Sequence, residues 1–506
     1  MLAGALVAAL GPGRAAALET DQYYTWGLPL ADGRATLNAK VNLEIARALA
    51  AAGTAQPGAP PTCQAIAREL RGRLHFEILQ PIEVWVAHSP LVPRIPETPE
   101  EELVFRRENL NGNHGPFDVG RWIPDSPTVA VGGVRFGTDK ISHFFSSGWR
   151  YRDTYLAARR RGASDEQARD AAIRWGILEE RSTNGLLTDG VFSRADLEAN
   201  LAGMDFDLGL CDGPDPLLAR DGDRWKVRRR FDWRSYVTPG WDESYNVSIY
   251  SASRWRKVRP RLLEYCGRRN EPEVAERLAR YRATFPPSPT LSAVQALVEE
   301  GKLPDPSRFT LAANCPALAA REPRTPEVVQ GAPAPQAAAP RAAEAEDAAG
   351  LEGEIAAREA DTERRAYTLA GVRLTSPEGV AGSLGWLLAD VESDFDCHTI
   401  CDLRGATLQL ETGLDGARLG VGYARIFGET GRFERFLPSP YLGLGVRASV
   451  VRTWRDGSLG PSGLTYAGLE GQFTITRVSF TLGTLWRVSG GAGRGWAVSW
   501  GFGWGF

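Results

Sequence analysis

The chain has 506 residues, of which 43% are hydrophobic and 24% charged, as in globular proteins that bury large cores. A formal net charge of −3 gives no electrostatic reason to expect a nucleic-acid partner. The sequence has no run of 18 apolar residues, so no membrane-spanning helix is predicted.

The N-terminal segment 1–17 has an apolar stretch followed by three small residues, Ala15, Ala16 and Ala17. This order is typical of a secretory signal peptide, although the usual basic residues before the apolar stretch are missing. A start site further upstream and a short buried helix are the alternatives. We favour a signal peptide, and therefore an exported protein.

Six cysteines, an even number, also suit an oxidising compartment. Cys397 and Cys401 lie in one predicted connection, and we expect them to pair with each other. The other four cysteines permit three pairings, between which the sequence does not choose; they are Cys63, Cys211, Cys266 and Cys315.

Residues 18–320 are predicted to form a mainly helical domain. Apolar residues recur at three- and four-residue spacing from Leu37 to Leu49 and from Ile66 to Leu74, as on the buried face of a helix. Residues 128–134 suit a short strand or an extended segment. Further helices are expected around 138–161, 165–181, 194–206 and 254–266, the second of them starting with a capping box at Ser164 and Gln167.

Residues 321–364 begin with a Pro/Ala-rich stretch that would bury little surface and is typical of an extended, semi-stiff linker. The charged stretch 352–365 is a candidate helix. The sequence after the linker divides into eight extended segments, which are 365–376, 380–390, 406–414, 417–427, 440–454, 464–476, 477–488 and 495–506.

The last segment alternates large apolar residues, from Trp496 to Trp504, with small ones, which indicates a strand with one bulky face. Such a face would favour aggregation in water, whereas lipid would cover it. We therefore predict a multidomain α + β chain, in which a helical domain and a linker precede an antiparallel eight-stranded β-barrel in an outer membrane.

Polar residues on the opposite faces of these strands are predicted to point into the barrel and fill it. The alternative is a soluble barrel or sandwich whose charges face outward. The residues predicted to point inward are Gln409, Glu411, Arg418, Arg447, Glu470, Gln472 and Arg487.

A set of polar residues in the helical domain is a candidate catalytic site. Asp139 and His143 are four residues apart, as are Asp196 and Asn200, so the members of each pair share one helix face. If the helices pack together, these residues would converge with Glu180. His143 would then act as acid or base, and the carboxylates would orient it or hold a divalent metal ion.

These residues resemble a motif of the VanZ-like families of bacterial envelope proteins, Asp-Lys-x-x-His-Phe, a later Glu, and Ser-x-x-Asp-Leu-x-x-Asn-x-x-Gly. The resemblance implies a shared site rather than a particular reaction, and its spacing favours Glu180 over Glu179. The motif falls on Asp139, Lys140, His143, Phe144, Glu180, Ser193, Asp196, Leu197, Asn200 and Gly203.

The same residues also have purely structural explanations. Asp139 would complement the dipole of a helix N-terminus, and Ser193 with Asp196 would form a capping box. His143 would be a hydrogen-bonded core histidine, and Asn200 would bond to backbone. Two basic runs with interleaved aromatic residues, 224–234 and 254–261, suit either anionic lipid and wall polymers or a solvated surface.

Together these features predict a protein whose barrel is surrounded by outer-membrane lipid. Its helical domain would lie in the periplasm and bind an anionic lipid or a peptidoglycan-related ligand through the polar cluster. One alternative is a metal-assisted or acid–base hydrolase of a lipid or wall intermediate. Another is a soluble secreted two-domain protein. The sequence does not identify a cofactor or a metal, and no nucleic-acid partner is expected.

Overall fold

A computed structural model describes residues 20–55, 60–75, 81–110, 126–182, 185–187, 190–315, 342–392, 401–428, 436–437, 440–456, 462–475, 478–491 and 495–505. The chain divides into two compact units, a mainly helical one that extends to Ala356 and one formed by the strands that follow. The predicted signal peptide 1–17 and the predicted Cys397–Cys401 disulfide lie outside the described residues.

The helical unit begins with the two helices that the apolar spacing predicts. Helix α2 (Arg34–Ala55) and helix α3 (Cys63–Leu74) pack against each other with their apolar faces buried. Two short helices that the sequence analysis did not predict follow, α4 (Pro81–His88) and α5 (Pro99–Glu108).

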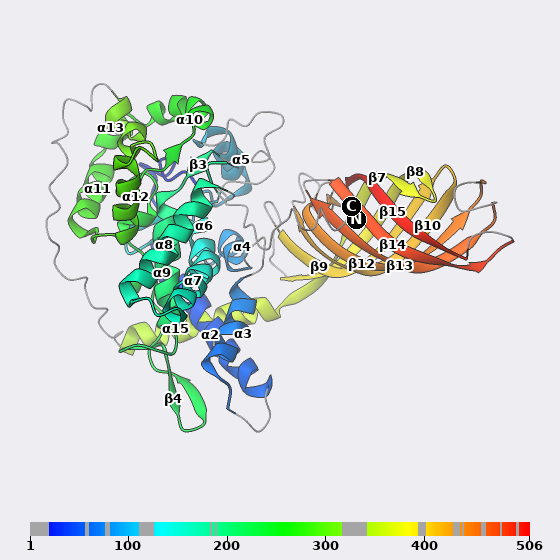
Figure 1. The fold of residues 1–506 in the computed structure, drawn as a ribbon, viewed down its shortest axis with the longest axis horizontal. Coiled ribbons are helices and arrows are strands. Elements are labelled where there is room, and N and C mark those ends of the chain that lie inside the picture. The colour runs from blue at the N-terminus through cyan, green and yellow to red at the C-terminus, as the bar shows by residue number, and fades with distance from the viewer. Residues whose placement is uncertain are drawn as a thin grey trace. The chain divides into compact units, whose positions relative to one another are not determined.

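The segment that carries the polar motif folds into a hairpin followed by four helices, and these helices are labelled in Figure 1. Strands β1 (Thr128–Val131) and β2 (Val134–Gly137) pair antiparallel. The predicted helix 138–161 is interrupted by a π-helical turn, His143–Ser147. The helices are α6 (Asp139–Ser142), α7 (Gly148–Arg160), α8 (Asp165–Arg181), which has the predicted capping box, and α9 (Arg194–Leu208).

Two disulfides, Cys63–Cys211 and Cys266–Cys315, select one of the three pairings that the sequence left open. Short strand pairs and further helices complete the unit. They are β3 (Val191–Phe192) with β6 (Ile249–Tyr250), β4 (Leu218–Asp221) with β5 (Arg224–Val227), α10 (Ala252–Glu264), α11 (Pro272–Thr284), α12 (Pro289–Glu299) and α13 (Leu311–Asn314).

The second half of the predicted linker is helical, which confirms the candidate helix 352–365 as far as Ala360, whereas the prediction of an extended segment is wrong for 342–350. Helix α15 (Ala342–Ala360) ends two residues before the first strand of the next unit. Its sequence is rich in Ala and Glu, which are strong helix formers, and Glu352 forms an ion pair with Arg230. Residues 316–341 lie outside the described part of the chain.

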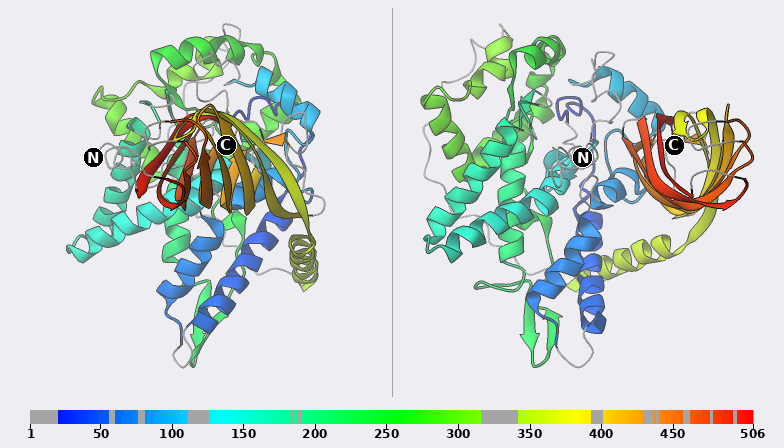
Figure 2. Two further views of the ribbon diagram at one scale, coloured as in Figure 1. Left: turned by 90° about the vertical axis from the view of Figure 1, so that its right-hand side faces the viewer. Right: turned by 45° about the vertical axis from the view of Figure 1, so that its right-hand side comes forward.

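Eight long antiparallel strands form the second unit, and each predicted extended segment corresponds to one of them. Strand β7 pairs with both β8 and β15, so the sheet closes into a ring (Figure 1, Figure 2). A two-residue strand, β11 (Phe436–Leu437), adds a parallel pairing to β7. The long strands are β7 (Thr362–Ser376), β8 (Gly379–Glu392), β9 (Cys401–Gly413), β10 (Gly416–Gly428), β12 (Pro440–Thr453), β13 (Thr465–Ile475), β14 (Val478–Ser489) and β15 (Trp496–Gly505).

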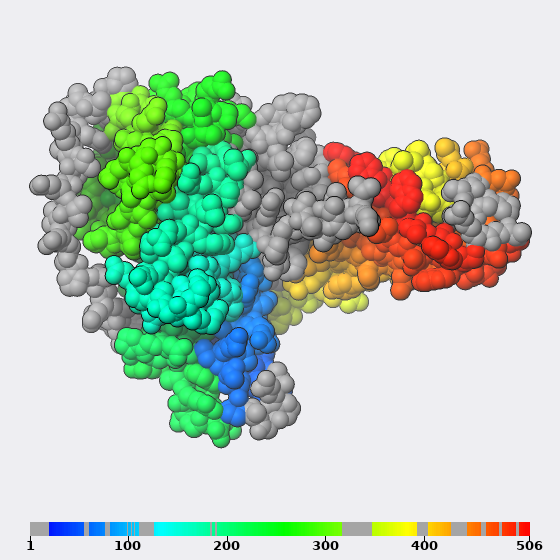
Figure 3. All heavy atoms as spheres, viewed as in Figure 1, coloured from blue at the N-terminus to red at the C-terminus, as the bar shows by residue number. Residues whose placement is uncertain are grey.

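The outer face of the ring is apolar. In the space-filling view of Figure 3, the residues of the ring are those coloured yellow to red. Of 28 exposed large apolar side chains among the described residues, 25 lie in the ring, including Trp500 at 45% and Phe502 at 51% exposure. Among the described helices, none is both long enough and apolar enough to cross a membrane.

The interior of the ring holds the charges. Six of the seven residues predicted to point inward are at most 5% exposed, so the alternative with outward charges is wrong. The exception is Arg487, which is half-buried near the end of β14 and donates a 2.9 Å hydrogen bond to the Gly491 carbonyl oxygen. At this end of the strand the turn supplies a partner for the arginine.

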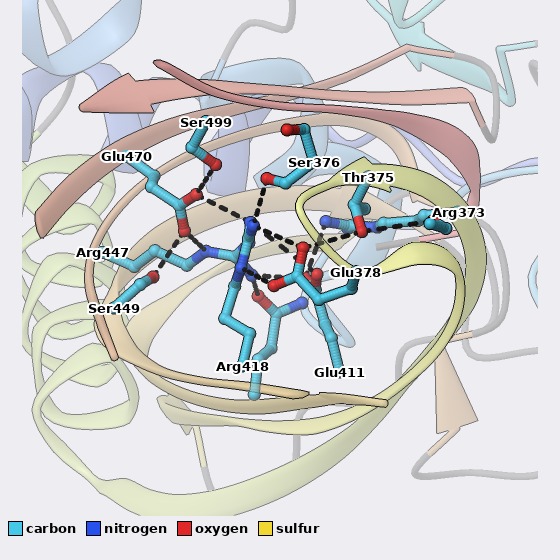
Figure 4. A network of polar contacts seen from close by, with 12 residues as sticks. Arg373, Thr375, Ser376, Glu378, Glu411, Arg418, Arg447, Ser449, Glu470 and Ser499 are labelled. Carbon is cyan, nitrogen blue, oxygen red and sulfur yellow. Dashed lines mark hydrogen bonds and ion pairs between the residues drawn. The ribbon is translucent and has the colours of Figure 1, made fainter. Parts of the chain in front are cut away.

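Ion pairs connect the buried charges inside the ring (Figure 4). Arg418 Nη1 lies 2.7 Å from Glu470 Oε1, and Arg447 Nη1 lies 2.7 Å from Glu411 Oε1. Arginines and glutamates are equal in number, so the charges of this network balance. Its charged members are Arg373, Arg418, Arg447, Glu378, Glu411 and Glu470.

Candidate functional site

Most of the predicted polar motif forms one buried cluster in the helical unit. Asp139, Lys140 and His143 come from α6 and the first residue of the π-helical turn, while Asp196 and Asn200 come from α9. These elements pack directly on each other, and the five residues are 1–5% exposed. The structure therefore brings four of the five predicted site residues into direct contact with this cluster, and it connects the fifth, Glu180, only through Ser193.

Gly203 on α9 and Gly148 at the start of α7 permit this close approach of the backbones. A Cβ atom at Gly203 on α9 would lie 2.0 Å from the Phe144 carbonyl oxygen, and one at Gly148 would lie 2.6 Å from the Gly203 Cα atom. The Phe144 ring is fully buried and contacts other aromatic rings, including Phe206 and Trp233. Gly203 and Phe144 of the motif therefore hold α9 against the turn.

His143 lies between an amide and a carboxylate that are four residues apart on α9. Its Nδ1 is 3.0 Å from Asn200 Oδ1, and its Nε2 is 3.1 Å from Asp196 Oδ2. An amide oxygen only accepts hydrogen bonds, so in this arrangement Nδ1 of neutral His143 carries the proton. Burial lowers the pKa of His143, although the Asp196 carboxylate opposes this effect. The neutral ring then directs its Nε2 lone pair toward Asp196.

Lys140 is the central cation of the cluster. Its Nζ lies 2.6 Å from Asp139 Oδ2, 2.6 Å from Asp196 Oδ1 and 2.9 Å from Glu243 Oε1. Burial by itself would lower the pKa of Lys140, but these carboxylates outweigh it and raise the pKa well above its usual value. The side chain is therefore an ammonium ion that faces three carboxyl groups.

The two aspartates respond in opposite ways to this environment. Burial raises the pKa of Asp139 well above its usual value, even though Lys140 opposes the shift. Burial would raise the pKa of Asp196 as well, but His143 and Lys140 outweigh it and lower that pKa. Asp196 is therefore the carboxylate that keeps its charge, and Asp139 is the one that readily binds a proton.

Glu180 joins the cluster through Ser193 and does so in preference to Glu179. Glu180 is 2% exposed, and its Oε2 accepts a 3.2 Å hydrogen bond from the Ser193 backbone N–H, whereas Glu179 is only half-buried. The Ser193 hydroxyl accepts a 3.2 Å hydrogen bond from the backbone N–H of Asp196, as an N-cap does. The other half of the predicted capping box is wrong, because the Asp196 side chain turns to Lys140 instead.

Sequence reasoning missed Glu243, the third carboxylate around Lys140. The Ser193 hydroxyl donates a 2.6 Å hydrogen bond to Glu243 Oε1, and the Thr20 hydroxyl donates a 3.0 Å bond to its Oε2. Glu243 lies 103 residues from Lys140, so no local spacing rule connects them. Lys140 belongs to the motif, but its sequence alone suggests a surface position, because lysines are seldom fully buried.

The aromatic residues in the first basic run belong to the core, and several of its arginines have acidic partners. Phe231 and Trp233 are at most 1% exposed. Arg229 Nε lies 3.0 Å from Asp215 Oδ2. Phe231 and Trp233 are therefore not exposed beside these charges, whereas Trp225 is half-buried and donates a 2.8 Å hydrogen bond to the Pro61 carbonyl oxygen.

Comparisons of the chain with protein-family models, with curated proteins and with solved structures give no match. The resemblance to the VanZ-like families stays a prediction. The chemistry of the cluster is therefore argued from its geometry. That geometry includes one possible metal-ligand set, because donor atoms of Asp139, His143 and Asp196 all lie within 4.8 Å of one another.

Proposed function

We propose that the ring is a β-barrel that anchors this protein in an outer membrane, with the helical unit in the periplasm. The observation that carries this proposal is the inversion of the ring, with apolar side chains outside and balanced charges inside. Lipid stabilises such an outer face, whereas water does not. The long strands have 10–15 residues, and a tilted strand of about 9–11 residues is enough to cross a bilayer.

Aromatic side chains near both ends of the strands support the same location. Trp486 pairs in register with Trp496 near one end of the ring, and Trp504 pairs with Val478 near the other end. All three tryptophans are exposed, and tryptophan favours the interface between lipid and water. Because paired charges occupy the interior, the proposed role is anchorage instead of transport through an open pore.

The anchor is tested by placing a charge at two depths of one strand. Leu482 and Val488 both point outward from β14, at 54% and 62% exposure, but Leu482 lies in mid-strand and Val488 near its end. In lipid vesicles, we expect Leu482→Arg to lower the free energy of unfolding by about 2–4 kcal/mol and Val488→Arg by about 0–1 kcal/mol. Urea titration of the refolded full chain, followed by its heat-modifiable migration on gels, measures both effects.

Equal effects of the two arginines would contradict the anchor, because only a bilayer distinguishes their depths. A full chain that stays monomeric in buffer without detergent would also contradict it.

In this location, lipids and wall polymers would be the nearest partners of the helical unit. Binding such a partner through the cluster would require the unit to open, because the cluster residues are 1–5% exposed. A hydrolase of a lipid or wall intermediate is the second candidate, favoured by the contact of His143 with Asn200, in which the amide oxygen orients a histidine whose Nε2 lone pair can accept a proton. Its test is product release from radiolabelled envelope lipids and peptidoglycan, expected for the wild type and lost in His143→Gln. Equal activity of both proteins would contradict it.

A further inference from the structure

The cluster contains buried oxygen and nitrogen atoms that lack the hydrogen-bond partners which buried polar atoms normally have. Among the described residues, neither Asp139 Oδ1 nor His143 Nε2 makes a hydrogen bond, and both atoms are shielded from solvent. Buried polar atoms are satisfied in the great majority of proteins, so each exception needs an explanation. The two atoms belong to residues that, with Asp196, present donor atoms within 4.8 Å of one another.

We infer that Asp139, His143 and Asp196 bind one divalent transition-metal ion, of the kind represented by Zn²⁺ or Mn²⁺. An imidazole nitrogen and two carboxylate oxygens suit these ions, whereas Ca²⁺ and Mg²⁺ favour all-oxygen sites. Three protein ligands also leave a coordination position for water or a substrate, as in catalytic zinc sites.

The charge of the cluster supports a divalent cation. Lys140 is the ammonium ion that faces Asp139, Asp196 and Glu243. Three carboxyl groups surround this one ammonium in a site that excludes water, so their full ionisation would leave two negative charges. Burying net charge is costly unless a counter-charge accompanies it, and one divalent ion would supply that charge.

The contacts around the three residues match those that orient metal ligands. Asn200 Oδ1 lies 3.0 Å from His143 Nδ1 and accepts a hydrogen bond from its N–H, which turns the lone pair of Nε2 toward Asp196. Metal-bound histidines commonly donate their other N–H in this way. Lys140 contacts Asp139 Oδ2 and Asp196 Oδ1, which leaves Asp139 Oδ1 and Asp196 Oδ2 for the ion.

A catalytic role for this metal ion rests on the hydrolase proposed above, in which the ion would take part in hydrolysis. Metal binding is nevertheless measured without any substrate, so the metal site and the hydrolase can fail separately. A metal-binding protein without activity would retain this inference and lose the hydrolase.

The test uses the full chain in detergent, freed of metal with a chelator and titrated with Zn²⁺ and, separately, Mn²⁺ by calorimetry. We expect one ion per chain in the wild type and no stoichiometric binding in His143→Ala or Asp196→Asn. The matched control is Asp205→Asn, which removes the same charge from an exposed position of the same helix and should bind like the wild type. Circular dichroism of each variant reports whether it is folded.

If a ligand variant does not fold, Asn200→Ala decides the question, because it removes the partner of His143 Nδ1 and leaves all three proposed ligands in place. We expect it to weaken binding by about 10–100-fold. The absorption spectrum of the Co²⁺-loaded wild type should show bands of nitrogen and oxygen ligation that change in this variant. A wild type that binds neither Zn²⁺ nor Mn²⁺, or variants that all bind as tightly as the wild type, would overturn the inference.

Discussion

At the scale of single residues, burial decides how the charged groups of the helical unit behave. Glu83 on α4 is 8% exposed and accepts hydrogen bonds from the hydroxyls of Ser126 and Ser142. Burial raises the pKa of Glu83, and the two serine hydroxyls only partly oppose this shift. The folded protein therefore binds a proton at Glu83 more tightly than the unfolded chain does.

This shift predicts a pH-dependent effect of Glu83→Gln. The stability that the raised pKa contributes is fully present below the unfolded pKa of about 4.3, and is lost as pH rises through the folded pKa. The midpoint of thermal unfolding should therefore fall, relative to that of Glu83→Gln, as the pH rises from 4 to 8. Circular dichroism measures both proteins, with Glu276→Gln at an exposed position of α11 as control. Parallel curves for the wild type and Glu83→Gln would show that burial does not shift this group.

At the scale of elements, the contact of α9 with the π-helical turn determines the shape of the polar cluster. The two backbones touch at Gly203, where even a methyl group would overlap the Phe144 carbonyl oxygen. Interruption of the helix by the turn leaves His143 facing α9, and π-helical turns recur at functional sites.

Alanine at two helical glycines separates this contact from helix propensity. Gly203→Ala should lower the free energy of unfolding by about 1–3 kcal/mol, because the added methyl group overpacks the interface. Gly72→Ala on α3 has no heavy atom within 4 Å of the new Cβ and should raise it by about 0.5–1 kcal/mol. Urea unfolding of both variants provides the comparison. A Gly203→Ala variant as stable as Gly72→Ala would contradict the close packing of α9.

At the scale of the whole molecule, the chain joins two units stabilised by different means. Disulfides and a large apolar core stabilise the helical unit, whereas strand pairing and internal ion pairs stabilise the ring. Both described disulfides lie in the helical unit, so their removal should act on that unit alone.

The double variant Cys63→Ser/Cys211→Ser tests this independence. We expect the free energy of unfolding of the helical unit to fall by about 2–5 kcal/mol. The temperature at which the ring unfolds, seen as a change in gel migration, should stay the same. Helical circular dichroism follows the first unit, and heat-modifiable migration follows the second. A matching fall in both temperatures would show that the two units unfold together.

Local pattern was enough to predict much of this fold. Alternation at period two gives each strand its two faces, so the eight strands and six of the seven inward residues were predictable without knowledge of their partners. Spacing of four residues likewise placed Asp139 with His143 and Asp196 with Asn200.

Contacts between distant residues depended on the tertiary structure. Glu243 meets Lys140, and Glu378 turns into the ring to meet Arg418, although neither has a periodic relation to its partner. The choice of disulfide pairing is of the same kind. Periodicity in the sequence indicates which face of a helix or strand is buried. The residues that this face contacts are determined only in the folded protein, because distant segments must pack together before water is excluded from their charged groups.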